Sequence, residues 1–189
     1  MPMPASRKGA CPVHDLQIIF AGFGGQGVLF AGKVTAYAGL IEGRHISWLP
    51  SYGPEMRGGT ANCGVCISDQ PIGSPLVTEP NVLVAMNLPS LEKFIGSVQP
   101  GGLVILDSSL IDAPINRDGL EVFRVPSSSL AEEHGLQGLS NMILVGKLFK
   151  ELHFCPPNTL DQALEKCVPA RKAAMLALNR QAIALGAET

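Results

Sequence analysis

The residues best suited to chemistry read Gly-Phe-Gly-Gly-Gln-Gly from Gly22 to Gly27, a match to the pattern G-x-G-x-x-G. Glycines let a backbone turn sharply and leave room for phosphates, and the start of a following helix offers free N–H groups. The pattern lies between a predicted strand and a predicted helix, which is the context that gives it meaning. The candidate residues for contacting a ligand or a partner chain are Gly22, Gly24, Gly25, Gln26 and Gly27.

A dinucleotide is one possible ligand of this loop, but one expected residue is missing. Dinucleotide sites place an acidic residue about 20 positions further on, at the end of the second strand. That strand ends Ser47-Trp48-Leu49-Pro50, while Glu42 precedes it and Glu55 lies in the following loop. A free-standing NAD(P)-binding reductase therefore stays an alternative. So does a tight turn that binds nothing or only meets a partner.

A second unusual stretch, Ser51 to Thr60, reads SYGPEMRGGT. Its glycines and proline fix the course of the loop. Arg57 can hold an anion or a carboxylate through two parallel hydrogen bonds, or form an exposed ion pair with Glu55. In a doubly wound fold this loop lies beside the glycine loop, over the ligand crevice. The candidate residues here are Tyr52, Glu55, Arg57, Gly58 and Gly59.

The pattern of apolar residues predicts the elements that position these loops. Strands are expected at residues 16–21, 45–49, 60–68, 82–86, 103–106 and 121–125. Helices are expected at residues 28–41, 90–98, 127–133 and 141–152, followed by two C-terminal helices over about 158–186. Asn158 is the expected N-cap of the first of these two, with Asp161 three residues on, and Pro169 is expected near the start of the last.

Strands that alternate with helices predict a Rossmann-like α/β fold, with a doubly wound, mainly parallel sheet, helices on both faces and a helical C-terminus. The strand at 60–68 follows its predecessor without a helix, so we expect it to run antiparallel. Residues 1–14 are expected to form a flexible leader and residues 15–189 a single α/β domain.

Composition excludes several classes of function. The net charge is −2 and no basic stripe is present, so nucleic acid is not an expected partner. No apolar run reaches the roughly 20 residues of a membrane span, and no apolar stretch follows Arg7 and Lys8 as it would in a secretory signal. We expect a cytoplasmic protein. Charged residues make up 16% of the chain, which suits either a subunit buried in a complex or a well-buried α/β core.

The five cysteines are unevenly spaced and do not resemble a disulfide framework. Cys11 and His14 have C-x-x-H spacing and Cys63 and Cys66 have C-x-x-C spacing, which together raise the possibility of a zinc site. An offset of three on a strand points two side chains to opposite faces, so we expect no such site. Asp107, at the end of a predicted strand, either contacts a ligand or caps the next turn.

Three stretches together resemble a known family: Gly22 to Val28, Tyr52 to Gly59, and Ile72-Gly73-Ser74-Pro75. They look like the gamma subunit, or gamma domain, of 2-oxoacid:ferredoxin oxidoreductases, and the resemblance covers roughly residues 16–153. Residues Asn62 to Ser68 and the Met86-Asn87 turn look closest to the members that act on 2-oxoglutarate and on branched-chain 2-oxoacids.

The resemblance implies a subunit of a heteromeric enzyme complex that is inactive alone. Such complexes convert a 2-oxoacid and CoA to acyl-CoA, CO2 and reduced ferredoxin, using thiamine diphosphate, Mg²⁺ and iron–sulfur clusters. The gamma piece carries none of these cofactors and no catalytic residue; it packs against the thiamine-diphosphate subunits and a ferredoxin-type subunit and helps to shape the CoA side of the site.

The sequence has neither a Gly-Asp-Gly motif nor a C-x₂-C-x₂-C-x₃-C-P run, the motifs of the cofactor-bearing subunits. A homo-oligomer of the isolated chain stays an open alternative. A Rossmann-like scaffold or regulatory module remains a further alternative.

Overall fold

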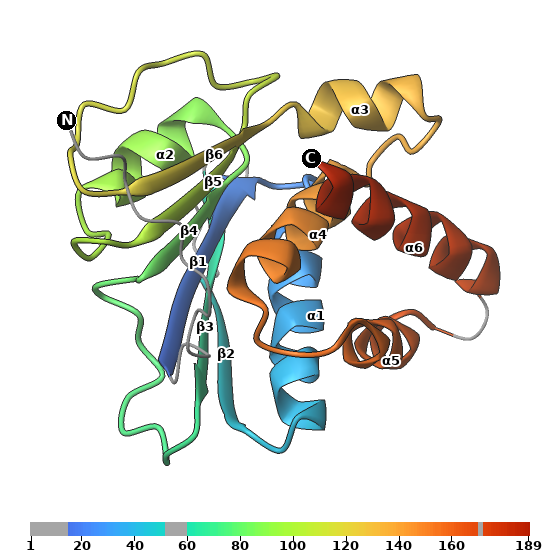
Figure 1. Ribbon diagram of the computed structural model, residues 1–189, viewed down its shortest axis with the longest axis horizontal. Helices are drawn as coiled ribbons and strands as arrows, with labels where there is room; N and C mark the ends of the chain where they lie inside the picture. The colour runs from blue at the N-terminus through green and yellow to red at the C-terminus, as the bar shows by residue number, and fades with distance from the viewer. Residues whose placement is uncertain (1–14, 52–59, 170–171) are drawn as a thin grey trace, which may run out of the picture.

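The computed structural model describes residues 15–51, 60–169 and 172–189. In these residues six strands form one sheet in the order β2-β3-β1-β4-β5-β6 (Figure 1). The strands are β1 (Asp15–Phe23), β2 (His45–Ser51), β3 (Thr60–Ser68), β4 (Val82–Ala85), β5 (Leu103–Asp107) and β6 (Glu121–Val125). The helices are α1 (Val28–Ile41), α2 (Leu88–Ile95), α3 (Ser127–Glu133), α4 (Ser140–Leu152), α5 (Pro157–Cys167) and α6 (Ala173–Glu188).

The sheet is mostly parallel, as predicted. Parallel pairs join β1 to β4, β4 to β5 and β5 to β6, whereas β3 runs antiparallel to both β1 and β2. Only residues 52–59 separate β2 from β3, fewer than the dozen or so that a parallel crossover needs. The prediction of an antiparallel strand at 60–68 is therefore confirmed.

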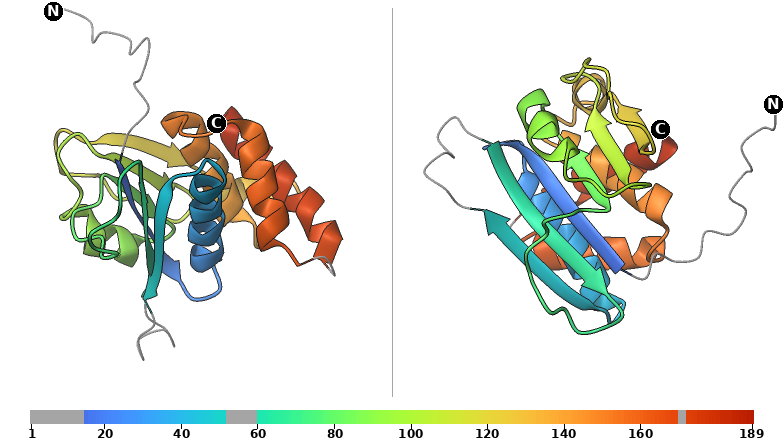
Figure 2. Two further views of the ribbon diagram at one scale, coloured as in Figure 1. Left: turned by 90° about the horizontal axis from the view of Figure 1, so that it is seen from below. Right: turned by 90° about the vertical axis from the view of Figure 1, so that its left-hand side faces the viewer.

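Side chains of β1 alternate between two cores, as a pleated strand requires. Leu16, Ile18 and Phe20 face the core that α1 and α4 share, and Ile19 and Ala21 face the core of α2. Figure 1 shows α2 on one side of the sheet and α1 and α4 on the other, with α5 outside α1 and α6 outside α4. The two further views in Figure 2 show the same layers. Helices cover both faces of the sheet, as expected.

Three helix starts differ in detail from those predicted. Asn158 is not an N-cap, because α5 already begins at Pro157, whose fixed φ suits the first helical position. Pro169, expected near the start of the last helix, lies shortly before α6, which begins at Ala173. Helix α2 begins at Leu88, two residues earlier than expected, since the Asn87 side chain accepts a hydrogen bond of 2.9 Å from the Ser90 N–H and caps the helix.

Candidate functional site

The glycine loop connects the carboxyl end of β1, near the middle of the sheet, to α1. The Gln26 N–H donates to the Phe23 carbonyl at 3.2 Å and closes the turn. Gly25 has a φ of 94° and Gly27 a φ of 72°, a left-handed conformation that strongly favours glycine. Gly27 is the N-cap of α1 and provides no side chain to the free N–H groups of the first turn. The loop therefore presents uncapped amide donors at a helix start.

The glycines of the loop divide into two kinds. A Cβ on Gly22 would lie 2.8 Å from Gln26 Oε1 and 3.0 Å from Met86 Cβ, and a Cβ on Gly27 would collide with the side-chain amide of Asn141. These two glycines allow close packing within the protein. Gly24 and Gly25 are exposed, and a Cβ on Gly25 would meet nothing within 4 Å. Open space for a ligand or a partner therefore lies over Gly25, and Gly24 beside it is exposed.

Gln26 points into the protein and holds the loop in place. Its Oε1 accepts hydrogen bonds from the Phe23 N–H at 2.6 Å and from Asn87 Nδ2 at 3.1 Å. Its Nε2 donates to the Met86 carbonyl at 3.1 Å. The side chain thus ties the turn to the junction of β4 and α2. Gln26 is a positioning residue for the loop, and its amide is already engaged within the chain.

Asn141 was not identified from the sequence, yet it anchors the other end of the loop. It lies in the first turn of α4, is 2% exposed, and donates through Nδ2 to the Gly27 carbonyl at 3.1 Å. No donor reaches its buried Oδ1 among the residues that the structure describes. An unpartnered buried amide oxygen is costly and calls for a hydrogen-bond donor, from a water molecule or a ligand.

A second asparagine with the same property lines the same cavity. Asn179 of α6 is 2% exposed; its Nδ2 donates to the Met175 carbonyl, and its buried Oδ1 likewise has no donor within the described part of the chain. The cavity has a volume of about 320 Å³, and Gly27 and Lys172 also line it. A hollow with two asparagines and one lysine in its wall therefore adjoins the start of α1.

The structure describes the strands on either side of the second motif but not the motif itself. Tyr52, Glu55, Arg57, Gly58 and Gly59 lie outside the described residues. The two strand ends that flank them are described. Ser51 at the end of β2 pairs with Asn62, and Thr60 at the start of β3 pairs with Phe23 at the end of β1. The segment is thus attached at the same edge of the sheet as the glycine loop, the edge where the sequence places it.

Two acidic residues considered in the sequence analysis, Asp107 and Glu42, have structural partners. Asp107 is 1% exposed; its Oδ1 accepts from the Ser109 N–H at 3.0 Å, and its carboxylate also binds Ser128 at the start of α3. Asp107 therefore caps the turn, which is one of the two roles that the sequence suggested for it. Glu42 lies at the opposite end of α1 from the glycine loop and accepts a hydrogen bond from Thr159. Its position does not suit a dinucleotide ribose.

The cysteines are arranged as structural residues. Cys63 faces α1, where its Sγ lies 3.6 Å from the Val28 carbonyl, and burial raises its pKa to about 12. Cys66 lies on the other face of β3 and lines a different cavity, so the two point to opposite faces, as predicted. Cys11 and His14 lie outside the described residues. Among the residues that the structure does describe, no three metal-binding side chains gather.

Two general properties of the described residues bear on the surroundings of the protein. No helix within residues 15–51, 60–169 and 172–189 is long and apolar enough to span a bilayer.

Phe23, next to the exposed glycines, is 41% exposed, and Leu49 near the end of β2 is 40% exposed. The edge of the sheet that carries both motifs therefore has an apolar component that a partner surface can cover.

Sequence comparisons reveal close relatives. A model of the family described as pyruvate ferredoxin/flavodoxin oxidoreductase matches residues 17–189. The ketoisovalerate oxidoreductase subunit VorA of Methanothermobacter marburgensis is 47% identical over 133 residues, covering 70% of this chain and 28% of VorA. The 2-oxoglutarate synthase subunit KorC of the same organism is 35% identical over 160 residues, covering 81% of this chain and 86% of KorC. The chain thus spans under a third of VorA but most of KorC.

Solved structures are similar over nearly the whole chain. The gamma subunit of a keto/oxoacid ferredoxin oxidoreductase from Geobacter sulfurreducens is 26% identical, with a TM-score of 0.78 over 92% of this chain and 96% of that one. A 2-oxoglutarate:ferredoxin oxidoreductase from Magnetococcus marinus, with 2-oxoglutarate, coenzyme A and succinyl-CoA bound, is 25% identical, with a TM-score of 0.83 over 93% of this chain and 31% of that one.

Proposed function

The chain belongs to the pyruvate ferredoxin/flavodoxin oxidoreductase family, and on this premise we propose that it is the gamma-type component of a 2-oxoacid:ferredoxin oxidoreductase. The observation that carries the proposal is the match to a separate gamma subunit over 92% of this chain and 96% of that one. The family resemblance that the sequence suggested is confirmed.

In the proposed complex the chemistry of decarboxylation and electron transfer belongs to other subunits. These hold thiamine diphosphate, Mg²⁺ and the iron–sulfur clusters, and they convert a 2-oxoacid and CoA to acyl-CoA, CO2 and reduced ferredoxin. Bound thiamine diphosphate would supply stabilisation of a carbanion, and the clusters would carry electrons. The contribution of this chain is to pack against those subunits and to complete the site for CoA.

We assign the CoA-facing and partner-facing surface to the edge of the sheet that carries both motifs. Support comes from the uncapped start of α1, whose partial positive charge suits a phosphate, and from the exposed Gly24 and Gly25. Asn141 adds a buried acceptor without a partner in the described chain. Arg57, whose type suits a phosphate or a carboxylate, belongs to the motif anchored beside it.

The substrate class and the compartment are further parts of the proposal. The relatives named for ketoisovalerate and for 2-oxoglutarate favour one of these two kinds of 2-oxoacid, and the choice between them depends on the catalytic subunits. The free thiols of Cys63, Cys66, Cys155 and Cys167 favour a reducing compartment, the cytoplasm.

Purification of the tagged chain from its native host tests the proposal. We expect it to bring with it a thiamine-diphosphate protein and a ferredoxin-type protein, identified by mass spectrometry. A variant with Gly24→Val should lose assembly or show a raised KM for CoA, because a branched side chain then stands on the exposed turn where a ligand or a partner must come close. The matched control is Gly96→Val, at another exposed glycine, where a Cβ meets nothing within 4 Å, on a helix end away from the loop. Recovery of the chain alone, with tight binding of NADPH, would contradict the proposal.

A further inference from the structure

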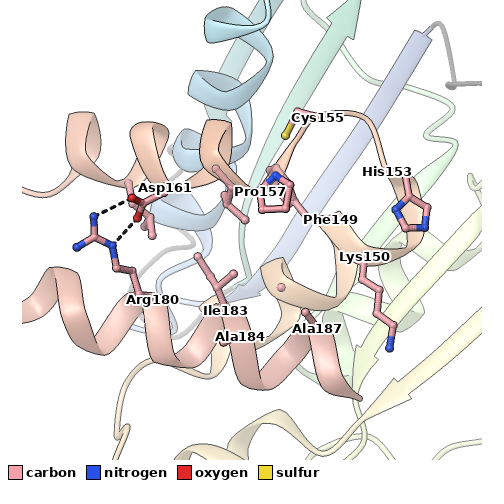
Figure 3. Close-up of a pocket in the computed structure, with 13 residues that line it drawn as sticks. Phe149, Lys150, His153, Cys155, Pro157, Asp161, Arg180, Ile183, Ala184 and Ala187 are labelled. Carbon is pink, nitrogen blue, oxygen red and sulfur yellow. Dashed lines mark hydrogen bonds and ion pairs between the residues drawn. The ribbon is translucent and has the colours of Figure 1, made fainter.

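A second cavity lies among the three C-terminal helices, away from the glycine loop (Figure 3). Its volume is about 460 Å³, within the range of about 300–1,000 Å³ that is usual for small-molecule pockets. Phe149 of α4 and Leu160 and Leu164 of α5 form an apolar floor and wall, and Ile183 of α6 forms the opposite wall. We call this cavity the C-terminal groove.

The groove exists because α6 packs on α4 and stands apart from α5. The backbones of α4 and α6 cross so closely that a Cβ on Gly146 or Gly186 would collide with the carbonyl of the other helix. Helix α5 packs chiefly against α1 instead. Two of the four α6 residues that line the space between α5 and α6, Ala184 and Ala187, have side chains too small to fill it. The hollow is therefore built by backbone contacts and not by one flexible side chain.

The two ends of the groove differ in charge. At one end Arg180 forms hydrogen-bonded ion pairs with Asp161 and Glu165, so its charge is already compensated. Lys150 and His153 line the groove and lie at the opposite end in Figure 3. Within residues 15–51, 60–169 and 172–189 neither has a carboxylate at ion-pair distance. An apolar channel thus ends in two side chains able to donate hydrogen bonds to an anion.

We propose that the C-terminal groove binds an aliphatic carboxylate. Its hydrocarbon chain lies between Phe149 and Ile183, where burial of apolar surface favours binding. Its carboxylate lies at Lys150, whose positive charge complements it, and at His153, whose imidazole N–H can donate a hydrogen bond to it. A neutral or cationic amphiphile of the same length lacks this second contribution. The site shares no lining residue with the glycine loop and goes beyond the proposed function.

Calorimetric titration of the full chain with octanoate tests this assignment, with 1-octanol and octyltrimethylammonium as neutral and cationic probes of equal chain length. We expect saturable binding at one site, tightest for octanoate and weakest for the cation. Replacing Lys150 by Gln should weaken octanoate binding about two- to fivefold, the usual range for one exposed charge contact, and leave 1-octanol binding unchanged.

A substitution that fills the groove separates shape from charge. Ala184→Phe should abolish binding of octanoate and of 1-octanol, whereas Ala174→Phe, at an exposed position of the same helix outside the groove, should not. Thermal melting of both variants checks that each remains folded. If Ala184→Phe unfolds the chain, Ala187→Leu provides the same test with a smaller side chain.

Three results would overturn the assignment. The first is absence of saturable octanoate binding to the free chain, and the second is octanoate binding that Ala184→Phe leaves unchanged. The third is binding to the free chain that is lost in the complex purified from the host, since a protein segment would then be the natural occupant. None of these results bears on whether the complex forms or needs this chain, so the proposed function is tested separately.

Discussion

Replacement of Gly27 by alanine should destabilise the chain for two reasons that a companion variant can separate. The φ of Gly27 is 72°, and a side chain in that conformation costs about 1–2 kcal/mol. The new Cβ would also collide with the amide of Asn141, and overpacking of a buried site typically costs about 1–3 kcal/mol. Gly25, with a φ of 94° and nothing within 4 Å of a Cβ, carries only the first cost.

We therefore expect Gly27→Ala to lower the free energy of unfolding by about 2–5 kcal/mol and Gly25→Ala by about 1–2 kcal/mol. In a domain of this size about 1 kcal/mol corresponds to a fall in Tm of about 2–4 °C. Urea denaturation gives the difference directly, provided that the slope of unfolding free energy against urea is the same for both variants.

A double-mutant cycle identifies Asn141 as the source of the difference. Asn141→Ala alone should cost about 0.5–1.5 kcal/mol, since it removes the hydrogen bond to the Gly27 carbonyl. Combined with Gly27→Ala it should cost about 1–3 kcal/mol less than the sum of the two, because the truncated side chain no longer meets the new Cβ. Equal losses for Gly25→Ala and Gly27→Ala, together with an additive cycle, would refute the packing that we describe at the start of α1.

Three further predictions concern the loops and the thiols. Gln26→Ala should lower the free energy of unfolding in urea by about 1–3 kcal/mol, because three hydrogen bonds at a part-exposed site are lost. The control is Gln70→Ala, which should lower it by less than about 0.5 kcal/mol, since the exposed Gln70 side chain makes no hydrogen bond among the described residues. Equal losses would show that Gln26 does not hold the loop. Burial and the nearby Glu42 raise the pKa of the Cys155 thiol from 9.0 to about 12. At pH 8 its thiolate fraction, and therefore its rate of alkylation measured by peptide mapping, should be about a thousandfold lower than in the unfolded chain. Rapid alkylation of Cys155 in the native protein at pH 8 would contradict the raised pKa. Arg57→Ala should weaken assembly or the acyl-CoA step by about 1–3 kcal/mol and leave the melting of the free chain nearly unchanged, and the reverse pattern would make Arg57 a structural residue.

Local sequence signals were enough to predict the elements around the loops. Helix α1 and strand β3 have the predicted bounds, because glycines at 27 and 43 mark the ends of the helix and small and apolar residues alternate along the strand. The prediction of Asn158 as an N-cap was wrong because Asn158 and the preceding Pro157 both favour a helix start. The fixed φ of the proline places the first helical residue at Pro157.

The roles of individual site residues depended on contacts that are distant in sequence. Gln26 lies in a motif that suggests a ligand contact, yet its side chain turns inward because the Met86 carbonyl and Asn87 offer it partners about 60 residues away. Asn141 belonged to a predicted helix and carried no local signal, since its partner Gly27 lies 114 residues earlier. Sequence patterns identify a loop, but long-range packing decides which of its residues remain free for a ligand.

Reconstitution of the complex with and without this chain tests the central claim most directly. The measurement is CoA-dependent reduction of a viologen dye by a 2-oxoacid, made on the free chain, on the partner subunits alone, and on the two combined. We expect no turnover by the free chain, because its sequence lacks the motifs for thiamine diphosphate and for a ferredoxin-type cluster, and full turnover only by the combination. Turnover by the free chain with added thiamine diphosphate, or equal turnover by the partner subunits with and without it, would contradict the account.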